Sequence, residues 1–307
     1  MKEEILKYFP KKIQKILNNL NNDIWLKLEE IRVSIDKPLI ICGNNFSAFL
    51  KENSHITDLP QESVFVSEKE ILCIIEMITE GSVYAVTDKI KNGYIVLPCG
   101  HRVGITGTTV IENNCIKFIK NISSLNFRIR REIKGVSDKI IPYIYDEGSV
   151  KNTLIIAPPR CGKTTLLRDI SRVLANNINK IKVSIVDERG EIAAAYNGVP
   201  QNDVGIYANV LDMCPKSQGM MLLVRAMSPD VIITDEIGGK EEIGTLQEIS
   251  RCGINIITTI HGFDINDVPL ELQAFFNVFI VLSKRNGTGT IEKIIKGGGD
   301  ICLKSSE

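Results

Sequence analysis

One stretch of the chain, residues 157–165, combines a glycine, a lysine and two threonines at close spacing. It follows a short apolar run, residues 153–156, and precedes a segment with helical spacing, residues 166–175. Strand, glycine-bearing loop and helix are the context that a phosphate-binding loop requires, because the loop N–H groups and the helix N-terminus together attract an anion. We therefore predict a nucleotide site formed by Ala157, Pro158, Pro159, Arg160, Cys161, Gly162, Lys163, Thr164 and Thr165.

Three of these residues would divide the work of binding ATP and Mg²⁺. Gly162 lets the backbone close around a phosphate, Lys163 brings a positive charge to the β and γ oxygens, and Thr164 offers a hydroxyl to Mg²⁺. The complete pattern has a glycine where Ala157 stands, and a methyl group is tolerated there only if the residue does not need a positive φ. The alternative is a plain strand-to-helix turn, in which a lysine would oppose the helix dipole.

Three further apolar runs end in residues that can act on a bound nucleotide. Residues 182–188 and 230–236 each end in an aspartate and a glutamate, and residues 254–261 end in a histidine. Buried parallel strands deliver such side chains to the carboxyl edge of their sheet, where ligands bind. This edge would bring together Lys163, Glu188, Glu236 and His261.

The chemistry of these side chains suits ATP hydrolysis, which needs positioning and charge neutralisation more than covalent help. Asp235 can hold Mg²⁺ directly or through water, and Glu236 faces the other way and can orient the attacking water. Glu188 is the alternative for that role. His261 is either a sensor of the γ-phosphate or a structural turn histidine. The strand that ends at Glu188 falls between the phosphate loop and Asp235. This fits the division of P-loop proteins whose sheet has an extra central strand.

Basic residues near the middle of the chain leave two interpretations open. Arg102 follows His101 at an expected turn between glycines. A basic cluster usually solvates a surface, but beside a nucleotide it neutralises phosphate charge as an arginine finger does. The other basic residues lie just before the second half of the chain: Arg128, Arg130, Arg131 and Lys134.

The first half of the chain has short segments of helical and strand type. Residues 4–18 place apolar residues near helical spacing between lysines, and we expect this stripe to pack on its own domain rather than on a membrane or partner. Ser67 and Glu70 have capping-box spacing before a helix over residues 71–78. Strands are expected over residues 30–35, 38–42, 93–97, 102–106, 115–119 and 125–129. These segments predict an α+β domain with a mostly antiparallel sheet.

The expected elements divide the chain into three parts. Residues 1–134 would form the α+β N-terminal domain, and residues 135–150 a linker with a short helix near 140–145. Residues 151–307 would form an α/β nucleotide-binding domain with a mostly parallel sheet. Asn286-Gly287 predicts a hairpin between residues 278–282 and 290–295.

Composition limits the kind of protein that this can be. With 307 residues and 44% hydrophobic residues, the chain can bury a sizeable core. Its 37 basic and 37 acidic residues balance, which argues against a broad electrostatic nucleic-acid binder. The eight cysteines lack zinc spacing, and we expect Cys161 to be a neutral filler rather than an oxidisable thiol. The chain starts without a signal-peptide apolar region, and no apolar run approaches about 20 residues. We therefore expect a cytoplasmic or peripherally attached protein.

The motifs resemble those of a known group of ATPases. Three segments of the second half resemble motifs of type II and IV secretion ATPases. Residues 186–192 resemble their Asp box, and residues 258–262 resemble their His box. Residues 228–236, with Arg225 upstream, resemble their Walker B motif. The closer resemblance is to the stage III sporulation protein AA family. Runs typical of that family resemble residues 100–107, 124–132, 158–169, 186–189 and 235–239.

This resemblance covers nearly the whole chain and implies more than the residues alone. It implies a RecA-like P-loop NTPase domain after residue 150 and a homo-oligomeric ring, a hexamer, in which the N-terminal domain packs against a neighbour's nucleotide site. Family arginines that reach across would correspond to Arg102, Arg128 and Arg131. It also implies an ATPase motor on the mother-cell side of a membrane, docked on membrane-embedded stage III sporulation proteins, with no nucleic-acid partner.

Two other functions remain as alternatives at this point. A nucleic-acid-associated P-loop ATPase is one, because a plastid and cyanobacterial relative of this fold adds a nucleic-acid-binding module; we expect no such module after residue 300. A scaffold that binds nucleotide with little turnover is the other, motivated by Ala157. The intact Lys163, Thr164, Asp235 and Glu236 argue against it.

Overall fold

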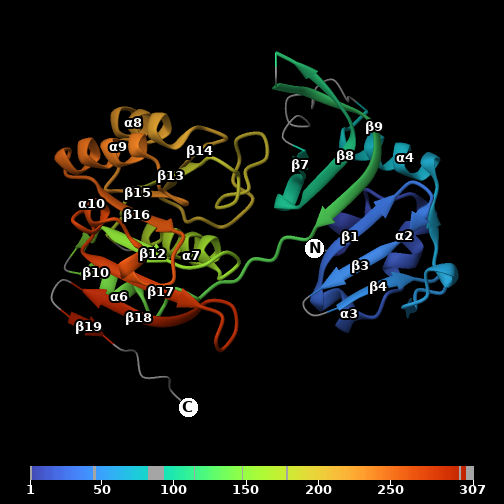
Figure 1. Cartoon of the computed structure of the whole chain (residues 1–307), viewed down its shortest axis with the longest axis horizontal. Helices are drawn as coiled ribbons and strands as arrows, with labels where there is room; N and C mark the ends of the chain where they lie inside the picture. The colour runs from blue at the N-terminus through green and yellow to red at the C-terminus, as the bar shows by residue number, and fades with distance from the viewer. Residues whose placement is uncertain are drawn as a thin grey trace. The chain divides into compact units, whose positions relative to one another are not determined.

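The computed structural model describes residues 2–43, 46–81, 93–113, 115–146, 148–177, 179–296 and 299–301. The chain divides into two compact units, Met1–Arg131 and Glu132–Glu307. Figure 1 shows the elements of each unit. The segment over residues 135–150 contains the short helix expected there, α6 (Ile141–Ile144), and the two-stranded β10 (Tyr145–Asp146) and β11 (Ser149–Val150). Ile140, Ile144 and Val150 pack in a core of the second unit.

The first unit is built on an antiparallel sheet with strand order β5-β4-β3-β1-β9-β8-β7. This confirms the α+β prediction. A second pair of strands, β2 (Lys37–Pro38) and β6 (Phe65–Val66), lies outside that sheet. The strands of the main sheet are β1 (Leu28–Ser34), β3 (Ile40–Gly43), β4 (Phe46–Leu50), β5 (Ile56–Thr57), β7 (Tyr94–Val96), β8 (Arg102–Glu112) and β9 (Cys115–Arg128).

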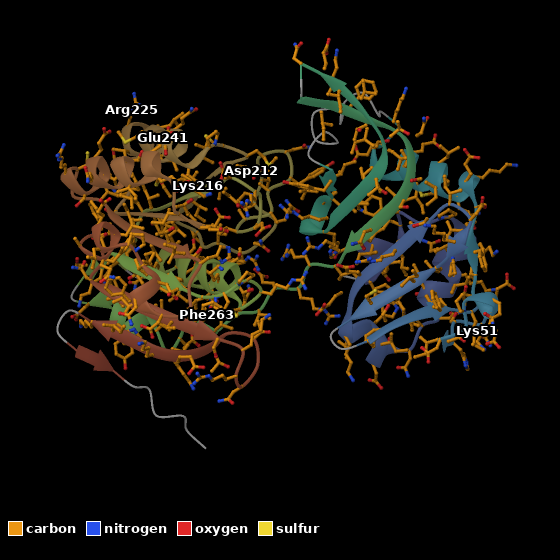
Figure 2. All side chains as sticks on the ribbon, in the orientation of Figure 1. Lys51, Asp212, Lys216, Arg225, Glu241 and Phe263 are labelled. Atoms are coloured by element: carbon orange, nitrogen blue, oxygen red, sulfur yellow. The ribbon has the colours of Figure 1, made fainter. Side chains whose placement is uncertain are left out.

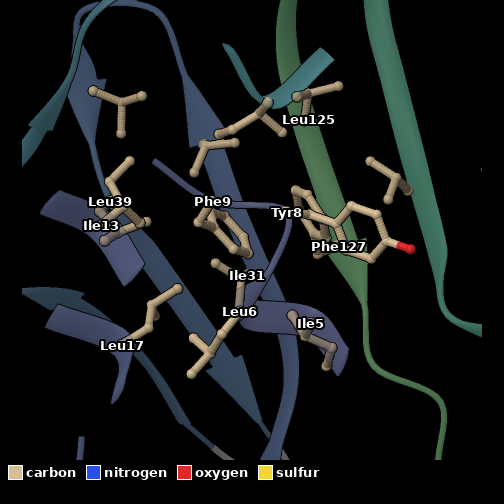
Figure 3. Close-up of a cluster of buried hydrophobic side chains, with 14 of the residues drawn as sticks. Ile5, Leu6, Tyr8, Phe9, Ile13, Leu17, Ile31, Leu39, Leu125 and Phe127 are labelled. Carbon is tan, nitrogen blue, oxygen red and sulfur yellow. The ribbon is translucent and has the colours of Figure 1, made fainter. Parts of the chain in front are cut away.

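The N-terminal stripe forms two helices where one was expected. These are α1 (Lys2–Leu6) and α2 (Lys11–Asn18), with Pro10 as the N-cap of α2. Proline restricts the residue before it to extended backbone, so the first helix ends upstream of Phe9. The stripe packs on its own unit, as expected. Figure 3 shows Phe9 against Phe127 of β9, with ring centroids 4.5 Å apart. The buried stripe residues are Ile5, Leu6, Phe9, Ile13, Ile16 and Leu17.

Two strands expected over residues 115–119 and 125–129 are one long strand, β9. The residues between them do not break it, because Lys120 and Ser124 pair with β8 on either side of a register shift at Gly107. A Cβ at Gly107 would lie 2.7 Å from the carbonyl oxygen of Lys120, so only glycine fits there. Among the described residues of the unit, the further helices are α3 (Asn22–Lys27) and α4 (Glu68–Ile78). The predicted capping box of Ser67 and Glu70 starts α4.

The second unit is built on a mostly parallel sheet with strand order β14-β13-β15-β16-β12-β17-β18-β19. The predicted hairpin joins β17 to β18 as an antiparallel pair. The extra strand between β12 and β15 is β16, which leads to His261, and not β13, which leads to Glu188. The strands are β12 (Thr153–Ile156), β13 (Val183–Asp187), β14 (Ala208–Asp212), β15 (Val231–Thr234), β16 (Asn255–Ile260), β17 (Val278–Ser283), β18 (Thr290–Lys296) and β19 (Gly299–Ile301).

Helices cover both faces of this sheet, because its central strands are apolar on both sides. Within β12, Ile155 faces one core, while Leu154 and Ile156 face the other. The first core takes its helical residues from α6 and α7 (Lys163–Ala175). The second takes them from α8 (Lys216–Met227), α9 (Lys240–Arg251) and α10 (Leu270–Gln273). Short 3₁₀ turns lie at Pro60–Glu62, Pro98–Gly100 and Ile265–Asp267.

The strand register brings the polar strand ends to one edge. Ile156 pairs with Ile260, and Val186 pairs with Thr234. The residues that follow these pairs leave the sheet together at its carboxyl edge. In the described part of the chain, no helix has the length and apolar character needed to cross a membrane.

Candidate functional site

The candidate phosphate loop, residues 157–165, joins β12 to α7 as the sequence predicts. Gly162 is the N-cap of α7 with a φ of 84°, and Arg160 also has a positive φ, 61°. Ala157 is fully buried and is not among the residues with positive φ. Its methyl group therefore meets the one condition under which alanine can replace glycine. Cys161 is buried as well, which fits a filler.

Lys163 turns back over this loop. Its Nζ donates to the carbonyl oxygens of Ala157 at 2.9 Å and Pro158 at 3.4 Å. Burial lowers the pKa of Lys163, although the charge of Glu236 opposes that change. The ammonium group thus lies above backbone carbonyls, at the start of a helix whose own N–H groups are anion donors. The positive groups converge on the place where a phosphate would bind.

A chain of contacts connects Lys163 to the end of β15. His261 Nδ1 lies 2.8 Å from Lys163 Nζ, and His261 Nε2 lies 2.8 Å from Glu236 Oε1. A lysine ammonium can only donate, so Nδ1 accepts and Nε2–H donates to the carboxylate. The backbone N–H of Glu236 donates to Thr259 Oγ1 at 2.9 Å, which fixes the turn after β15. Three of the four residues expected to meet at this edge are therefore joined.

The fourth, Glu188, has a different partner. Its Oε2 lies 2.6 Å from Nζ of Lys216, the first residue of α8, and Lys216 Nζ also lies 3.6 Å from Asp235 Oδ1. Glu236 has an ion pair with Arg189 at 3.7 Å, besides its contact with His261. The two glutamates that could orient water thus belong to separate contact sets at the same edge.

The residues expected to hold Mg²⁺ fit that ion. Asp235 is almost fully buried, and no hydrogen-bond donor among the described residues reaches its Oδ1. Burial raises the pKa of Asp235 to about 6, against the opposing charge of Lys216. No three His, Cys, Asp or Glu side chains of the described residues converge as a metal cage. Mg²⁺ commonly binds one or two protein oxygens plus substrate phosphates, so the absence of a cage does not conflict with Asp235 and Thr164 as the expected ligands.

Of the predicted arginines, Arg225 is the one that belongs to the same unit as Lys163. Arg225 lies on α8 and lines an open groove of 730 Å³ together with Met221, Leu222, Glu241 and Thr245. Figure 2 shows Arg225 beside Glu241, away from the labelled Lys216. Arg225 follows Lys216 by nine positions on α8, about 13.5 Å along the helix axis. The structure therefore does not bring Arg225 to the Lys163 contacts.

Arg102, Arg128 and Arg131 belong to the first unit. The Arg102 guanidinium lies 4.4 Å from the ring centre of Tyr94. Arg131 donates to the carbonyl oxygens of Trp25 at 2.6 Å and Leu28 at 3.0 Å. Arg128 is exposed at the end of β9 and pairs in register with Arg102 of β8.

Sequence reasoning missed two contributors to the site. Lys216 is one, and its signal was a lysine at the start of a helix, the same unfavourable placement that drew attention to Lys163. Asp187 is the other: its Oδ1 and Oδ2 accept from the backbone N–H groups of Glu191 and Ala193, both at 2.8 Å. Asp187 thereby fixes the loop that carries Glu188 and Arg189.

Comparison with solved structures defines the class of the fold. The ATPase DotB of Legionella pneumophila is similar with a TM-score of 0.58 and 17% identity, over 88% of this chain and 77% of that one. The pilus retraction motor PilT with bound ADP is similar with a TM-score of 0.57 and 15% identity, over 95% of this chain and 81% of that one. The chain thus shares its fold with these two ATPases: a RecA-like second unit, preceded by a smaller α+β unit.

Sequence comparison then gives the family. Residues 1–301 match the family described as "Sporulation stage III, protein AA". Stage III sporulation protein AA of Bacillus subtilis is 33% identical over 318 aligned residues, which cover 99% of this chain and 98% of that protein. Ycf45 of Cyanidium caldarium is 34% identical over 54% of this chain and 48% of its own length. The chain belongs to the stage III sporulation protein AA family.

Proposed function

We propose that this protein is an ATP-hydrolysing motor of a secretion-like transport complex that acts during sporulation. One observation carries the proposal: the contact chain from Lys163 through His261 to Glu236, at the same sheet edge as Asp235. In this proposal Lys163 is the phosphate-binding cation, His261 the γ-phosphate sensor and Glu236 the water-orienting carboxylate, and Asp235 beside Glu236 binds the metal. The family and the likeness to secretion ATPases support the same function.

The proposed roles follow from these contacts. The loop N–H groups and Lys163 bind the phosphates, as a Walker A motif does, with Thr164 and Asp235 holding Mg²⁺. Bound Mg²⁺ would neutralise charge on the β and γ oxygens. Glu236 orients the attacking water, because it directly follows Asp235 and because Glu188 is already engaged by Lys216. His261 links the phosphate-binding cation to that carboxylate, so a bound phosphate would compete for Lys163 and change the position of Glu236.

The assembly belongs to the same proposal. We infer a ring of identical subunits, six by resemblance to the family, in which an arginine from one subunit completes the site of the next. Arg128 is the best candidate of the first unit, because Arg131 is held by backbone carbonyls and Arg102 stacks on Tyr94. The ring would dock on membrane-embedded stage III sporulation proteins, on the mother-cell side.

Two substitutions test the site. Lys163→Ala removes the cation that faces the phosphates, so we expect nucleotide binding to fall by at least about 100-fold. Glu236→Gln keeps the binding groups and removes the carboxylate that orients water, so we expect binding within about threefold of wild type and turnover reduced at least about 100-fold. Binding of a fluorescent ATP analogue and phosphate release measure the two effects.

A control variant and a contrary result complete this test of the nucleotide site. Lys182→Ala removes a half-exposed lysine of the same unit, paired with Asp230 at 3.8 Å, and should change neither quantity. Full turnover in either site variant would refute the assignment. Wild-type protein that binds ATP and never releases phosphate, with or without a membrane fraction of sporulating cells, would favour a nucleotide-binding scaffold.

A further inference from the structure

Lys216 occupies a position that neither its helix nor its surroundings favour by themselves. It is the first residue of α8, after Pro215, where a positive charge opposes the helix dipole. Its side chain is only 5% exposed, although lysine is rarely buried without a partner. Both the helix dipole and burial therefore disfavour an ammonium group here, so other contacts must stabilise it.

Two carboxylates hold it. Lys216 Nζ lies 2.6 Å from Glu188 Oε2, a charge-assisted hydrogen bond, and 3.6 Å from Asp235 Oδ1. The ammonium group therefore lies between two strand ends, since Glu188 follows β13 and Asp235 follows β15.

The two carboxylates need this cation. Asp235 is almost fully buried, and its Oδ1 has no hydrogen-bond donor among the described residues. The ion pair with Lys216 is therefore the contact that offsets its buried charge. A buried carboxylate that loses such a partner is strongly destabilising.

We propose that Lys216 is a positioning residue, a fixed counter-charge that holds Glu188 against the end of β15 and shares Asp235 with Mg²⁺. This rests on the proposed function only in assigning Asp235 to the metal. Lys216 keeps Glu188 away from the water-orienting position, which leaves that position to Glu236. It also keeps Asp235 aligned by a charge that is part of the chain, so that the aspartate needs no ion to stay in place.

If Lys216 is a fixed counter-charge, its removal should change how strongly a divalent cation stabilises the protein. In the wild-type protein, Lys216 already balances the carboxylate pair, so Mg²⁺ without nucleotide should stabilise the fold only slightly. In Lys216→Met the aliphatic stem is replaced at similar length and the charge is gone. Glu188 and Asp235 then repel each other, and a divalent cation can take over the balance. Mg²⁺ binding to the folded state alone raises its stability by mass action.

The experiment measures thermal unfolding of the full chain without nucleotide, in EDTA and in excess MgCl₂ at constant ionic strength. We expect Lys216→Met to unfold at a lower temperature in EDTA, and MgCl₂ to raise its Tm by at least about 4 °C more than that of wild type. Lys182→Met is the matched control, because Lys182 pairs with a single exposed carboxylate, Asp230. Its response to MgCl₂ should equal that of wild type.

A second variant separates charge balance from packing. Lys216→Met combined with Glu188→Gln removes one carboxylate together with the cation, so we expect the double variant to be more stable in EDTA than Lys216→Met. An equal response of wild type and Lys216→Met to MgCl₂ would overturn the proposal, and so would a double variant no more stable than the single one or unable to fold. Because no nucleotide is used, these results are independent of whether Lys163→Ala abolishes ATP binding.

Discussion

Ala157 is the residue at which the phosphate loop departs from the usual pattern, and its surroundings explain why the departure is tolerated. Its backbone N–H donates to the carbonyl of Ile260 at 3.2 Å, and its carbonyl accepts from Lys163. The methyl group is fully buried in the core that α7 forms with the sheet. The backbone at this position is thus held by β16 and Lys163, and the side chain contributes to packing.

We therefore predict that Ala157→Gly leaves nucleotide affinity within about twofold and lowers the free energy of unfolding by about 1–2 kcal/mol. The loss combines a buried methyl group with the greater backbone freedom of glycine in the unfolded chain. Nucleotide titration and denaturant unfolding of the same preparation measure both effects. A gain in affinity beyond about fivefold would mean that the loop needs a conformation that alanine restricts.

The site residues differ in how far the sequence reveals them. Lys163, Asp235 and Glu236 could be predicted because each stands at a fixed offset from an apolar strand, and strand ends of a parallel sheet meet. Lys216 could not be paired in advance, because its partners Glu188 and Asp235 lie on two other segments and the pairing depends on how α8 packs on β13. The contacts that connect Lys163 to Glu236 through His261 likewise depend on β16 lying between β12 and β15.

Among the elements, the turn between β7 and β8 contains a buried histidine. His101 is 2% exposed, and its Nδ1 accepts from the backbone N–H of Arg130 at 3.1 Å. Its Nε2 has no hydrogen-bond partner among the described residues, and Glu4 comes no nearer than 4.0 Å. Burial lowers the pKa of His101 to about 4, more than the charge of Glu4 raises it.

The sign of the resulting pH dependence follows from the lowered pKa. The unfolded chain takes up a proton near pH 6.5, whereas folded His101 does so only near pH 4. The folded state therefore loses stability as the pH falls from about 6.5 to 4, by up to about 1.4 kcal/mol per pH unit. His101→Gln retains an acceptor for Arg130 and cannot be protonated, so we expect its stability to vary less over this range.

Tryptophan fluorescence can measure this pH dependence of stability. Trp25 is the single tryptophan, and it is buried in the core of the same unit as His101, so its fluorescence follows the unfolding of that unit. Denaturant unfolding across the pH range gives the slope for each variant. The control is His55→Gln, because His55 is exposed. A slope for His101→Gln equal to that of wild type would contradict the assignment.

Element boundaries show where sequence patterns stop being informative. The capping box of α4 and the Asn286-Gly287 hairpin were predictable because each is a local interaction. The division of the N-terminal stripe at Pro10 was not predicted, although proline carries a local restriction that indicates it. The length of β9 was not predictable, because the strand continues from Lys120 to Ser124 through the pairing of these two residues with β8, a contact outside the segment itself.

For the assembled protein, the proposed ring predicts that one subunit completes the site of another. Specific activity should then rise with protein concentration, until all subunits are assembled. A flat, non-zero activity over a wide concentration range, with a mass determination that gives a monomer, would contradict the ring. This measurement asks whether a neighbour is needed, without identifying which residue the neighbour supplies.

Mixing two inactive variants identifies that residue. Lys163→Ala lacks the phosphate-binding cation, and Arg128→Ala lacks the exposed arginine at the end of β9. If Arg128 acts on a neighbour's nucleotide, each variant is inactive alone. In a randomly mixed ring, about one site in four combines an intact Lys163 with a neighbour's intact Arg128. Phosphate release should therefore recover to about a quarter of the wild-type level when equal amounts are mixed and allowed to exchange.

The matched control for this mixture is Arg131→Ala. Arg131 donates to two backbone carbonyls of its own unit, so its loss should lower the stability followed by Trp25, and mixing it with Lys163→Ala should restore no more activity than dilution allows. Recovery with Arg131→Ala and none with Arg128→Ala would move the role to Arg131. No recovery with either, from variants that still assemble with wild-type mass, would mean that these two arginines do not act between subunits.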